Sequence, residues 1–224
     1  RPDELKIYPC SLIESAELMQ RYRDGSWRPY SHDELVEVLL ACFEHTPEYC
    51  RLTRVVRDIP GTDIVVGDLT TNFRQIVERE LEARGGRSED IRSREIRGQR
   101  VASEALRLDE QWYSTAIGDE VFLQYIAADR RIAGFLRLSL PHEAPILDEL
   151  SGAAMVREVH VYGQSLALGE DSPGRAQHSG LGTQLIERAV EIAAAQGYAR
   201  LAVISAVGTR AYYRKRGFED VDGE

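Results

Sequence analysis

Apolar and polar positions switch between two periods over the first hundred residues, which predicts strands and helices in turn. Residues 5–8 and 51–59 are short apolar runs that end at prolines, a pattern typical of strands. Between them Ser31, with a glutamate three residues later, has the spacing of a capping box ahead of a helical apolar pattern. A second helix is expected from Asn72 to the glycine pair that starts at Gly85. This order of strand, helix, strand and helix predicts parallel βα packing.

From about residue 96 the pattern changes to strand-like segments joined by short turns, which predicts antiparallel hairpins. These segments are residues 121–126, 132–140 and 155–162. After a loop over 163–176, Gly182 leads a strongly periodic helix that ends at Gly197. The expected order continues with a strand over 201–205, a helix over 209–216 and a last strand over 218–221.

Two βα units cannot close a barrel or wind a full sheet, so the first part of the chain looks incomplete. Residues 1–95 are expected to be the back end of a larger α/β domain, whose earlier part would precede Arg1. Residues 96–224 are expected to form a second domain, a mixed and largely antiparallel sheet flanked by helices. The predicted fold class is therefore α/β, in two parts.

Composition narrows the class of protein. The chain has 224 residues, 43% hydrophobic and 29% charged, enough to bury one large core or two modest ones and too apolar for a disordered protein. No run approaches the roughly 20 apolar residues of a membrane helix. The first residues also lack the apolar core of a signal peptide. These features predict a soluble, cytoplasmic protein with no membrane partner.

The cysteines predict no metal site. Cys10, Cys42 and Cys50 are odd in number and lack the spacing of a disulfide framework or a CxxC motif. We expect them to be reduced and mostly packed thiols.

Charge is distributed unevenly along the chain. The formal net charge of −9 argues against a nucleic-acid partner, but residues 51–100 carry more basic than acidic side chains. Lysine occurs only at Lys6 and Lys215, so nearly all basic residues are arginines. Because arginine binds phosphates bidentately and also forms surface ion pairs, RNA contact and a salt-bridged surface both remain open for this segment.

The turn over residues 177–182, between a strand and the long helix, carries the most chemical information. Gly180 and Gly182 let the backbone approach a ligand closely, and the free amides at the helix start attract an anion such as pyrophosphate. By itself a glycine turn of this kind more often has no ligand.

The order of elements around this turn resembles GNAT-type acetyltransferases. A strand over 155–162, a Q-x-x-G-x-G turn, an amphipathic helix, a second strand and a tyrosine pair follow one another. The resemblance implies that the strand backbone binds the pantetheine arm of acetyl-CoA, that the turn binds its pyrophosphate, and that a tyrosine protonates the leaving thiolate. The residues implied for acetyl-CoA are Glu158, Val159, His160, Val161, Gln177, His178, Gly180, Leu181, Gly182, Thr183 and Gln184, with Tyr213 or Tyr212 at the thioester.

Longer motifs narrow the resemblance to the family of the Elongator catalytic subunit, the tRNA wobble-uridine acetyltransferases. These motifs are residues 5–9, 54–60, 72–75 and 90–95, followed by 157–163, 177–180, 202–205 and 207–218. They keep the family's order over nearly the whole chain. The resemblance implies a radical S-adenosylmethionine domain with an iron–sulfur cluster, of which residues 1–95 would be the C-terminal part and linker, followed by the acetyltransferase domain.

That family is understood to use acetyl-CoA to attach a carboxymethyl group to carbon 5 of the wobble uridine of tRNA. Carbon 5 is not a nucleophile toward a thioester, so a radical must form on the acetyl group before it adds. The implied partners are acetyl-CoA and tRNA, and a homodimer or accessory subunits are left open. Protein lysine N-acetylation in the same acetyl-CoA pocket is the alternative, and a noncatalytic tRNA-binding module is a third possibility.

The chain departs from the family in two places. The iron–sulfur cluster needs a three-cysteine motif that the cysteines of this chain do not match, so we expect those ligands upstream of Arg1 and the chain to be a truncated piece. Many relatives carry cysteines in the linker where this chain has Ser88 and Ser93, so no linker zinc site is expected.

Several further side chains are candidates within this resemblance. Lys6 would end a barrel strand near the radical site and hold an acetyl or phosphate oxygen, although a structural placement is equally open. The consecutive tyrosines lie about 100° apart on a helix, so only one is expected at the thioester while the other packs in the core. His160, His178 and Glu158 are open to reading as bases or as packed side chains. The arginines implied for tRNA backbone contacts are Arg84, Arg87, Arg92, Arg94 and Arg97.

Overall fold

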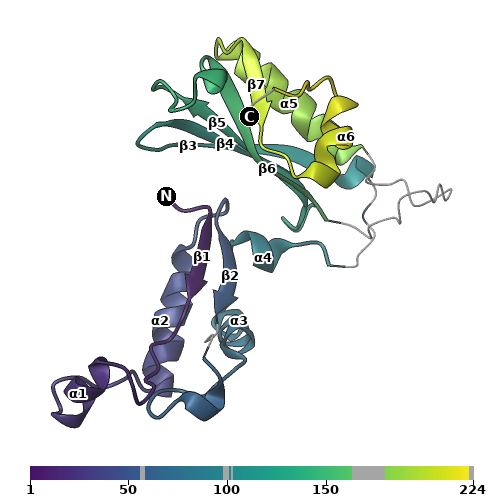
Figure 1. Ribbon diagram of the computed structural model, residues 1–224. Coiled ribbons are helices and arrows are strands. Elements are labelled where there is room, and N and C mark those ends of the chain that lie inside the picture. The colour runs from purple at the N-terminus through teal and green to yellow at the C-terminus, as the bar shows by residue number, and fades with distance from the viewer. Residues whose placement is uncertain (56–58, 98–100, 102, 163–179, 222–224) are drawn as a thin grey trace. The chain divides into compact units, whose positions relative to one another are not determined.

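The chain forms two compact units, Arg1–Arg94 and Glu95–Glu224, in a computed structural model (Figure 1). The structure describes residues 1–55, 59–97, 101, 103–162 and 180–221. Along the described residues, no helix is both long and apolar enough to cross a membrane. Each unit is described below by itself.

The first unit is a pair of parallel strands packed against helices. Its elements are β1 (Glu4–Ile7), α1 (Leu18–Arg23), α2 (His32–His45), β2 (Arg51–Val55), a 3-10 turn (Gly61–Asp63), α3 (Phe73–Ala83) and α4 (Ile91–Arg94). β1 pairs with β2 in parallel, which confirms the predicted βα packing. Apolar faces of α2 and α3, including Phe43 and Val77, pack with Leu52 of β2 to form the core. The short helix α1 has no counterpart in the predicted elements.

The ends of the helices follow local sequence signals. The backbone amide of Glu34 donates to Ser31 Oγ at 3.2 Å, and Ser31 N donates to Glu34 Oε2 at 2.8 Å, so the predicted capping box is present. Asn72 occupies the cap position of α3 but its side chain makes no cap hydrogen bond. Gly85 has a φ of +77° just after α3, a conformation that other residues rarely adopt.

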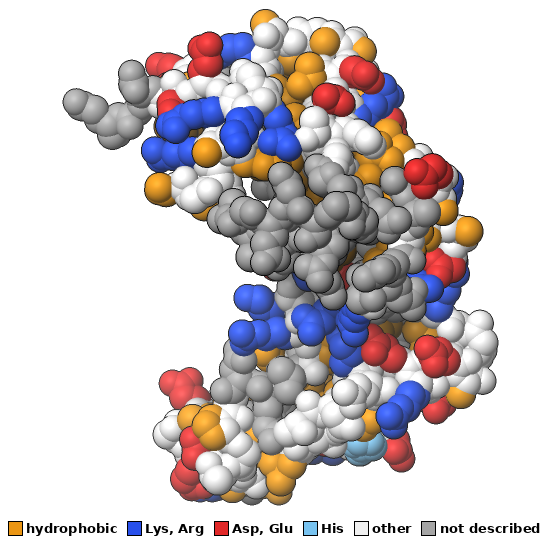
Figure 2. Space-filling view, turned by 90° about the vertical axis from the view of Figure 1, so that its right-hand side faces the viewer, with side chains coloured by type: hydrophobic (Ala, Val, Ile, Leu, Met, Phe, Trp, Pro, Cys, Tyr) orange, Lys and Arg blue, Asp and Glu red, His pale blue; other side chains and the backbone are white. Residues whose placement is uncertain are grey.

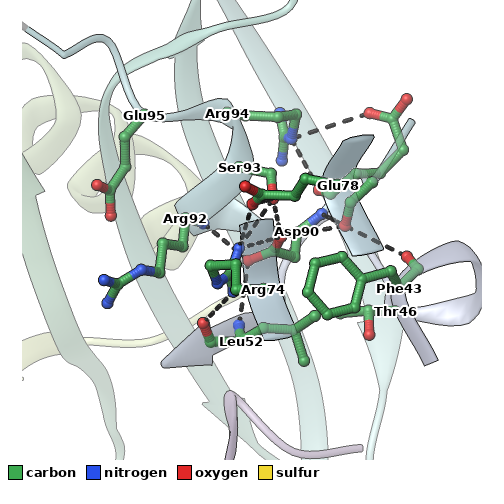
Figure 3. Close-up of polar contacts among 12 residues, drawn as sticks. Phe43, Thr46, Leu52, Arg74, Glu78, Asp90, Arg92, Ser93, Arg94 and Glu95 are labelled. Atoms are coloured by element: carbon green, nitrogen blue, oxygen red, sulfur yellow. Dashed lines mark hydrogen bonds and ion pairs between the residues drawn. The ribbon is translucent and has the colours of Figure 1, made fainter. Parts of the chain in front are cut away.

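A buried carboxylate ties α3, α4 and β2 together (Figure 3). Asp90 is fully buried and accepts hydrogen bonds from Leu52 N at 3.1 Å, Arg92 N at 3.0 Å and the hydroxyls of Ser88 and Ser93. Arg74 Nη1 lies 3.8 Å from its Oδ2. Since a buried charge is tolerated only when it is paired and hydrogen-bonded, we interpret this cluster as the central cross-link of the first unit.

The second unit is a five-stranded sheet in the order β3-β4-β5-β6-β7. Its elements are a 3-10 turn (Ser103–Ala105), β3 (Arg107–Ser114), β4 (Gly118–Ile126), β5 (Ile132–Pro141), a 3-10 turn (Asp148–Leu150), β6 (Ala153–Val161), α5 (Leu181–Ala195), β7 (Arg200–Val203), a 3-10 turn (Val207–Thr209) and α6 (Arg210–Arg214). The first four strands are antiparallel and β7 pairs with β6 in parallel. The predicted hairpins are confirmed.

Helix α5 covers one face of this sheet (Figure 1). Leu185, Ile186 and Ala189 of α5 are buried against Leu136 and Val156 of the sheet. On the opposite face the guanidinium of Arg137 contacts the rings of both Phe122 and Phe135, with its carbon 5.3 and 5.4 Å from their centroids. Cation–π contacts and an ion pair to Glu158 stabilise this buried charge.

The prediction differs from the structure at both ends of the second unit. β3 was not predicted, because its residues are mostly polar and pair with one neighbour only, as the edge of the sheet. The strand predicted over 218–221 is wrong: those residues are irregular. Phe218 N donates to Tyr213 O at 3.3 Å, and Arg214 forms an ion pair with Asp220, so the chain folds back on α6 instead of extending.

The cysteines are free thiols in different environments. Cys10 is exposed, Cys42 is half-buried and Cys50 is buried. The described residues contain no group of three or more His, Cys, Asp or Glu side chains that could hold a metal ion.

Candidate active site

Strand β7 ends before its neighbour β6 does, because its last residue, Val203, is paired while β6 continues. Their pairing runs from Ala153 opposite Arg200 to Val156 opposite Val203, and β6 then continues to Val161. β5 still pairs with β6 as far as Gly134 opposite Val161. The edge of β6 over 158–161 therefore faces an opening that no other described strand fills, and its backbone groups are placed to bind an extended ligand.

A bulge at Arg157 marks the point of separation. Leu138 is opposite Val156 and Arg137 is opposite Glu158, so one residue of β6 has no partner on β5. Arg157 pairs with Glu120 at 2.7 Å and Glu158 with Arg137 at 2.9 Å, both on the face away from α5. A bulge bends and twists its strand, and this one falls directly after Val156, the last residue of β6 that pairs with β7.

The first turn of α5 lies beyond the end of β6. Gly180 occupies the cap position, and Gln184 N donates to Gly180 O at 3.0 Å. The amides of Leu181, Gly182 and Thr183 therefore have no acceptor within the helix, and its first turn contains no acidic residue. Such a helix start favours an anion. Gln177 and His178, predicted for the same site, lie outside the described residues.

Tyr212 packs directly on this helix start. A Cβ atom built on Gly182 would lie 2.4 Å from Tyr212 Oη and 3.5 Å from Val161 Cγ2. The hydroxyl of Tyr212 thus occupies the space that a side chain at position 182 would need, next to the end of β6. Gly182 is required here for close approach.

Arg216 is the functional candidate that the sequence analysis missed. Its Nε and Nη2 donate to Thr183 Oγ1 at 3.0 and 2.7 Å, and its guanidinium carbon lies 3.4 Å from the ring centroid of Tyr212. A signal was present in the helix predicted over 209–216, where Arg216 follows Tyr212 by four and would face it, although the observed α6 ends at Arg214.

Tyr213 points elsewhere, as predicted for consecutive residues. Its ring contacts Phe218 edge-on at 5.5 Å and Tyr212 at 5.2 Å. Burial raises the pKa of Tyr213, with a further contribution from Tyr212, and burial also raises the pKa of Tyr212. Both hydroxyls therefore keep their protons at neutral pH, as a general acid must.

Other predicted site residues have clear environments. The ring of His160 stacks on Phe135 at 5.8 Å and contacts Tyr162 at 4.4 Å, so the side chain is packed among aromatic rings. Val159 packs toward the α5 side of the sheet. Lys6 belongs to the first unit, where it is exposed on β1 opposite Arg54.

Most of the arginines predicted to contact tRNA are engaged in ion pairs. Arg84 pairs with Glu37 at 2.5 Å and Glu80 at 2.9 Å, which raises the pKa of its guanidinium. Arg87 pairs with Glu89 at 2.6 Å.

The remaining arginines of this group differ in exposure. Arg92 Nη1 donates to Thr53 O at 3.1 Å, and the side chain of Arg97 is 65% exposed. Arg94 is buried, and its Nε and Nη2 donate to the carbonyl oxygens of Glu89 and Glu48, both at 2.8 Å. The structure argues against Arg94 as a tRNA contact, because its guanidinium cross-links main-chain segments.

Comparisons with known proteins agree with the division into two units. Residues 2–83 match the Radical_SAM C-terminal domain, and residues 89–218 match the acetyltransferase (GNAT) family. The predicted α/β fold class, a radical SAM C-terminal part followed by a GNAT domain, is confirmed.

Named relatives match nearly the whole chain. A protein named tRNA uridine(34) acetyltransferase from Dehalococcoides mccartyi is 38% identical, covering 99% of this chain and 50% of the relative. Elongator complex protein 3 of Mus musculus is 36% identical, covering 97% and 41%. The solved structure of Methanocaldococcus infernus Elp3 with an N-terminal deletion has a TM-score of 0.87 at 34% identity and covers 98% of this chain and 54% of that one. The chain spans about half the length of the curated relatives that it matches.

Proposed function

The chain belongs to the acetyltransferase (GNAT) family, and from this premise we propose that it carries the acetyl-donor half of an enzyme that modifies the wobble uridine of tRNA. The names of its relatives support tRNA uridine as the substrate. The acyl donor is acetyl-CoA, and the product is a carboxymethyl group on carbon 5 of that uridine. The observation that carries the proposal is the opening between β6 and β7, which leads to the helix start with Arg216.

The described residues fit acetyl-CoA. The exposed edge of β6 over 158–161 binds the amide groups of the pantetheine arm, as a neighbouring strand would. The amides of Gly182 and Thr183 bind the pyrophosphate. The bend at Arg157 keeps β7 away from the arm, so that the thioester reaches the point where the strands separate.

Different roles are proposed for the two tyrosines. Tyr212 Oη lies at Gly182, the phosphate end of the proposed site, and the pantetheine arm separates that end from the thioester. Tyr213 is therefore the candidate that protonates the leaving thiolate. Lys6 stays a candidate for holding an acetyl or phosphate oxygen in the radical part of the reaction.

No ligands of an iron–sulfur cluster are assigned among the described residues. An iron–sulfur cluster needs several converging thiolates, and the described residues contain no such group. S-adenosylmethionine and the cluster belong to the complete reaction implied by the radical SAM match.

The first test measures acetyl-CoA binding and hydrolysis by this chain, with tRNA or with lysine peptides. We expect acetyl-CoA to bind and its hydrolysis to rise with tRNA. Stimulation by lysine peptides instead would favour a protein acetyltransferase, and a chain that binds no acetyl-CoA would contradict the proposal.

Tyr213→Phe is expected to lower turnover about 100-fold while leaving acetyl-CoA affinity within a few-fold, since general acids contribute roughly 10²–10⁴ to a rate. Tyr212→Phe is expected to act mainly on affinity. Because the pKa of Tyr213 is raised, wild-type turnover should not decline until the pH passes the ordinary tyrosine value of 10.0. If Tyr213→Phe and Tyr212→Phe lowered turnover equally, the assignment of Tyr213 as the general acid would be wrong.

The exposed arginines predicted to contact tRNA can be tested by charge reversal. Arg87→Glu with Arg97→Glu is expected to weaken tRNA binding and to lower the slope of log affinity against log salt by about one for each lost phosphate contact. Each single reversal is also compared with Arg79→Glu, an exposed position on α3 that undergoes the same change of charge. An unchanged salt slope in the first pair would show that these arginines are only ion-paired surface.

A further inference from the structure

Arg216 has an unusual electrostatic position within the second unit. Four basic residues lie within 210–216 of the second unit. Figure 2 shows Lys and Arg side chains gathered on one side of this unit. Among them Arg214 pairs with Asp220, but Arg216 forms no ion pair with any described residue. It is half-buried, and it donates hydrogen bonds to the uncharged oxygens of Thr183 and Tyr212.

Two other arginines of this unit that are buried or half-buried have a carboxylate partner. Arg137 is 2% exposed and pairs with Glu158, and the half-buried Arg131 pairs with Asp129. Arg216 instead lies at the first turn of α5, through Thr183, where the helix dipole is positive. A cation at that end of a helix is unfavourable unless an anion joins it.

The guanidinium of Arg216 is held in one orientation. Nη1 donates to Tyr212 O at 2.7 Å while the ring of Tyr212 supports its flat face. Of the five guanidinium N–H groups, the contacts to Thr183 and Tyr212 use three, which leaves two for a ligand. Thr183 Oγ1 accepts from Arg216, so its own proton remains available to a further acceptor.

We infer that Arg216 binds the pyrophosphate of the acyl donor and makes the site selective for coenzyme A thioesters over pantetheine thioesters that lack phosphate. The inference rests on the proposed function, because it deepens the role of the same site. Two guanidinium N–H groups, the Thr183 hydroxyl and the amides of the α5 start all face one anion. Planar bidentate donors are the ones that suit phosphate oxygens.

The test compares the affinities of three ligands by isothermal titration calorimetry or by displacement. Acetyl-CoA and its 3′-dephospho form both carry the pyrophosphate, whereas S-acetyl-pantetheine does not. Arg216→Gln is expected to weaken the first two by about 10- to 100-fold, the loss of a charge-assisted hydrogen bond. Its affinity for S-acetyl-pantetheine should stay within a few-fold of wild type.

Lys215→Gln is the matched control, with the same change of charge at the preceding residue, whose side chain is exposed and forms no ion pair with a described residue. Thr183→Val is a second variant that removes the anchor of Arg216, and it should weaken acetyl-CoA binding less in the Arg216→Gln background than alone. Thermal unfolding of each variant identifies loss of fold.

The outcomes separate the two proposals. If Arg216→Gln weakens all three ligands equally, or if Lys215→Gln weakens acetyl-CoA as strongly, Arg216 has no specific role and the inference is overturned. If wild-type protein binds none of the three ligands, the proposed function itself fails.

Discussion

Gly182→Ala is expected to reduce acetyl-CoA affinity about 100-fold or more without unfolding the protein. The new methyl group would lie 2.4 Å from Tyr212 Oη, so Tyr212 must move. The ring of Tyr212 supports the guanidinium of Arg216, so a shift of Tyr212 would move both side chains away from the phosphate end of the proposed site. Alanine inside a helix is favoured over glycine by up to about 1 kcal/mol, so the stability of α5 should be kept or raised.

The double variant Gly182→Ala with Tyr212→Phe supplies the internal check. Removing the hydroxyl leaves the ring carbon Cζ at 3.6 Å from the new Cβ, an ordinary contact, so the ring can return under Arg216. Affinity should therefore recover in part. Gly208→Ala is the control, because a Cβ there meets nothing within 4 Å. If Gly182→Ala alone bound acetyl-CoA with wild-type affinity, Tyr212 would be free to move, and its close contact with Gly182 would not be needed for binding.

Asp90→Ala should destabilise the first unit by about 3–5 kcal/mol. The variant leaves Leu52 N and Arg92 N without their carboxylate acceptor and deprives Arg74 of one of its carboxylates. Buried donors left unsatisfied each cost about 1–3 kcal/mol. The exposed Asp63→Ala is the matched control and should change stability by less than about 0.5 kcal/mol.

The two tryptophans allow this loss to be located. Trp27 lies in the first unit and Trp112 on β3 in the second, so single Trp→Phe backgrounds report each unit in urea unfolding. Asp90→Ala should shift the transition seen by Trp27 and leave that seen by Trp112 in place. A shift of both together would mean that the units unfold as one, and an unchanged Trp27 transition would contradict the role of the buried cluster.

Elements with strong local signals were predictable from the sequence. The capping box at Ser31 and the turn glycine at Gly85 act through their own backbone, so spacing alone identifies them. β3 could not be identified in this way, because an edge strand paired on one side tolerates polar residues and gains its order from β4.

Ser88 and Ser93 show what spacing could not predict. The sequence indicated only that they replace possible zinc ligands, whereas the structure brings both hydroxyls to one buried oxygen of Asp90. Their partners depend on how the chain folds back between α3 and α4. The same holds for Arg216, whose contact with Thr183 spans residues far apart in the sequence. The roles given to the individual site residues stay predictions.

The bulge in β6 also has a consequence for length variation in this strand. In a regular strand, residues three apart face opposite sides of the sheet, yet Val156 and Val159 both pack toward α5. The bulge explains this, because Arg157 has no partner on β5 and adds one residue between them. Deleting Arg157 would restore strict alternation without turning either valine outward. The shortened chain should fold with its core intact, while β6 would lose the bend that follows its last pair with β7, so that the proposed acetyl-CoA site changes shape without loss of the fold.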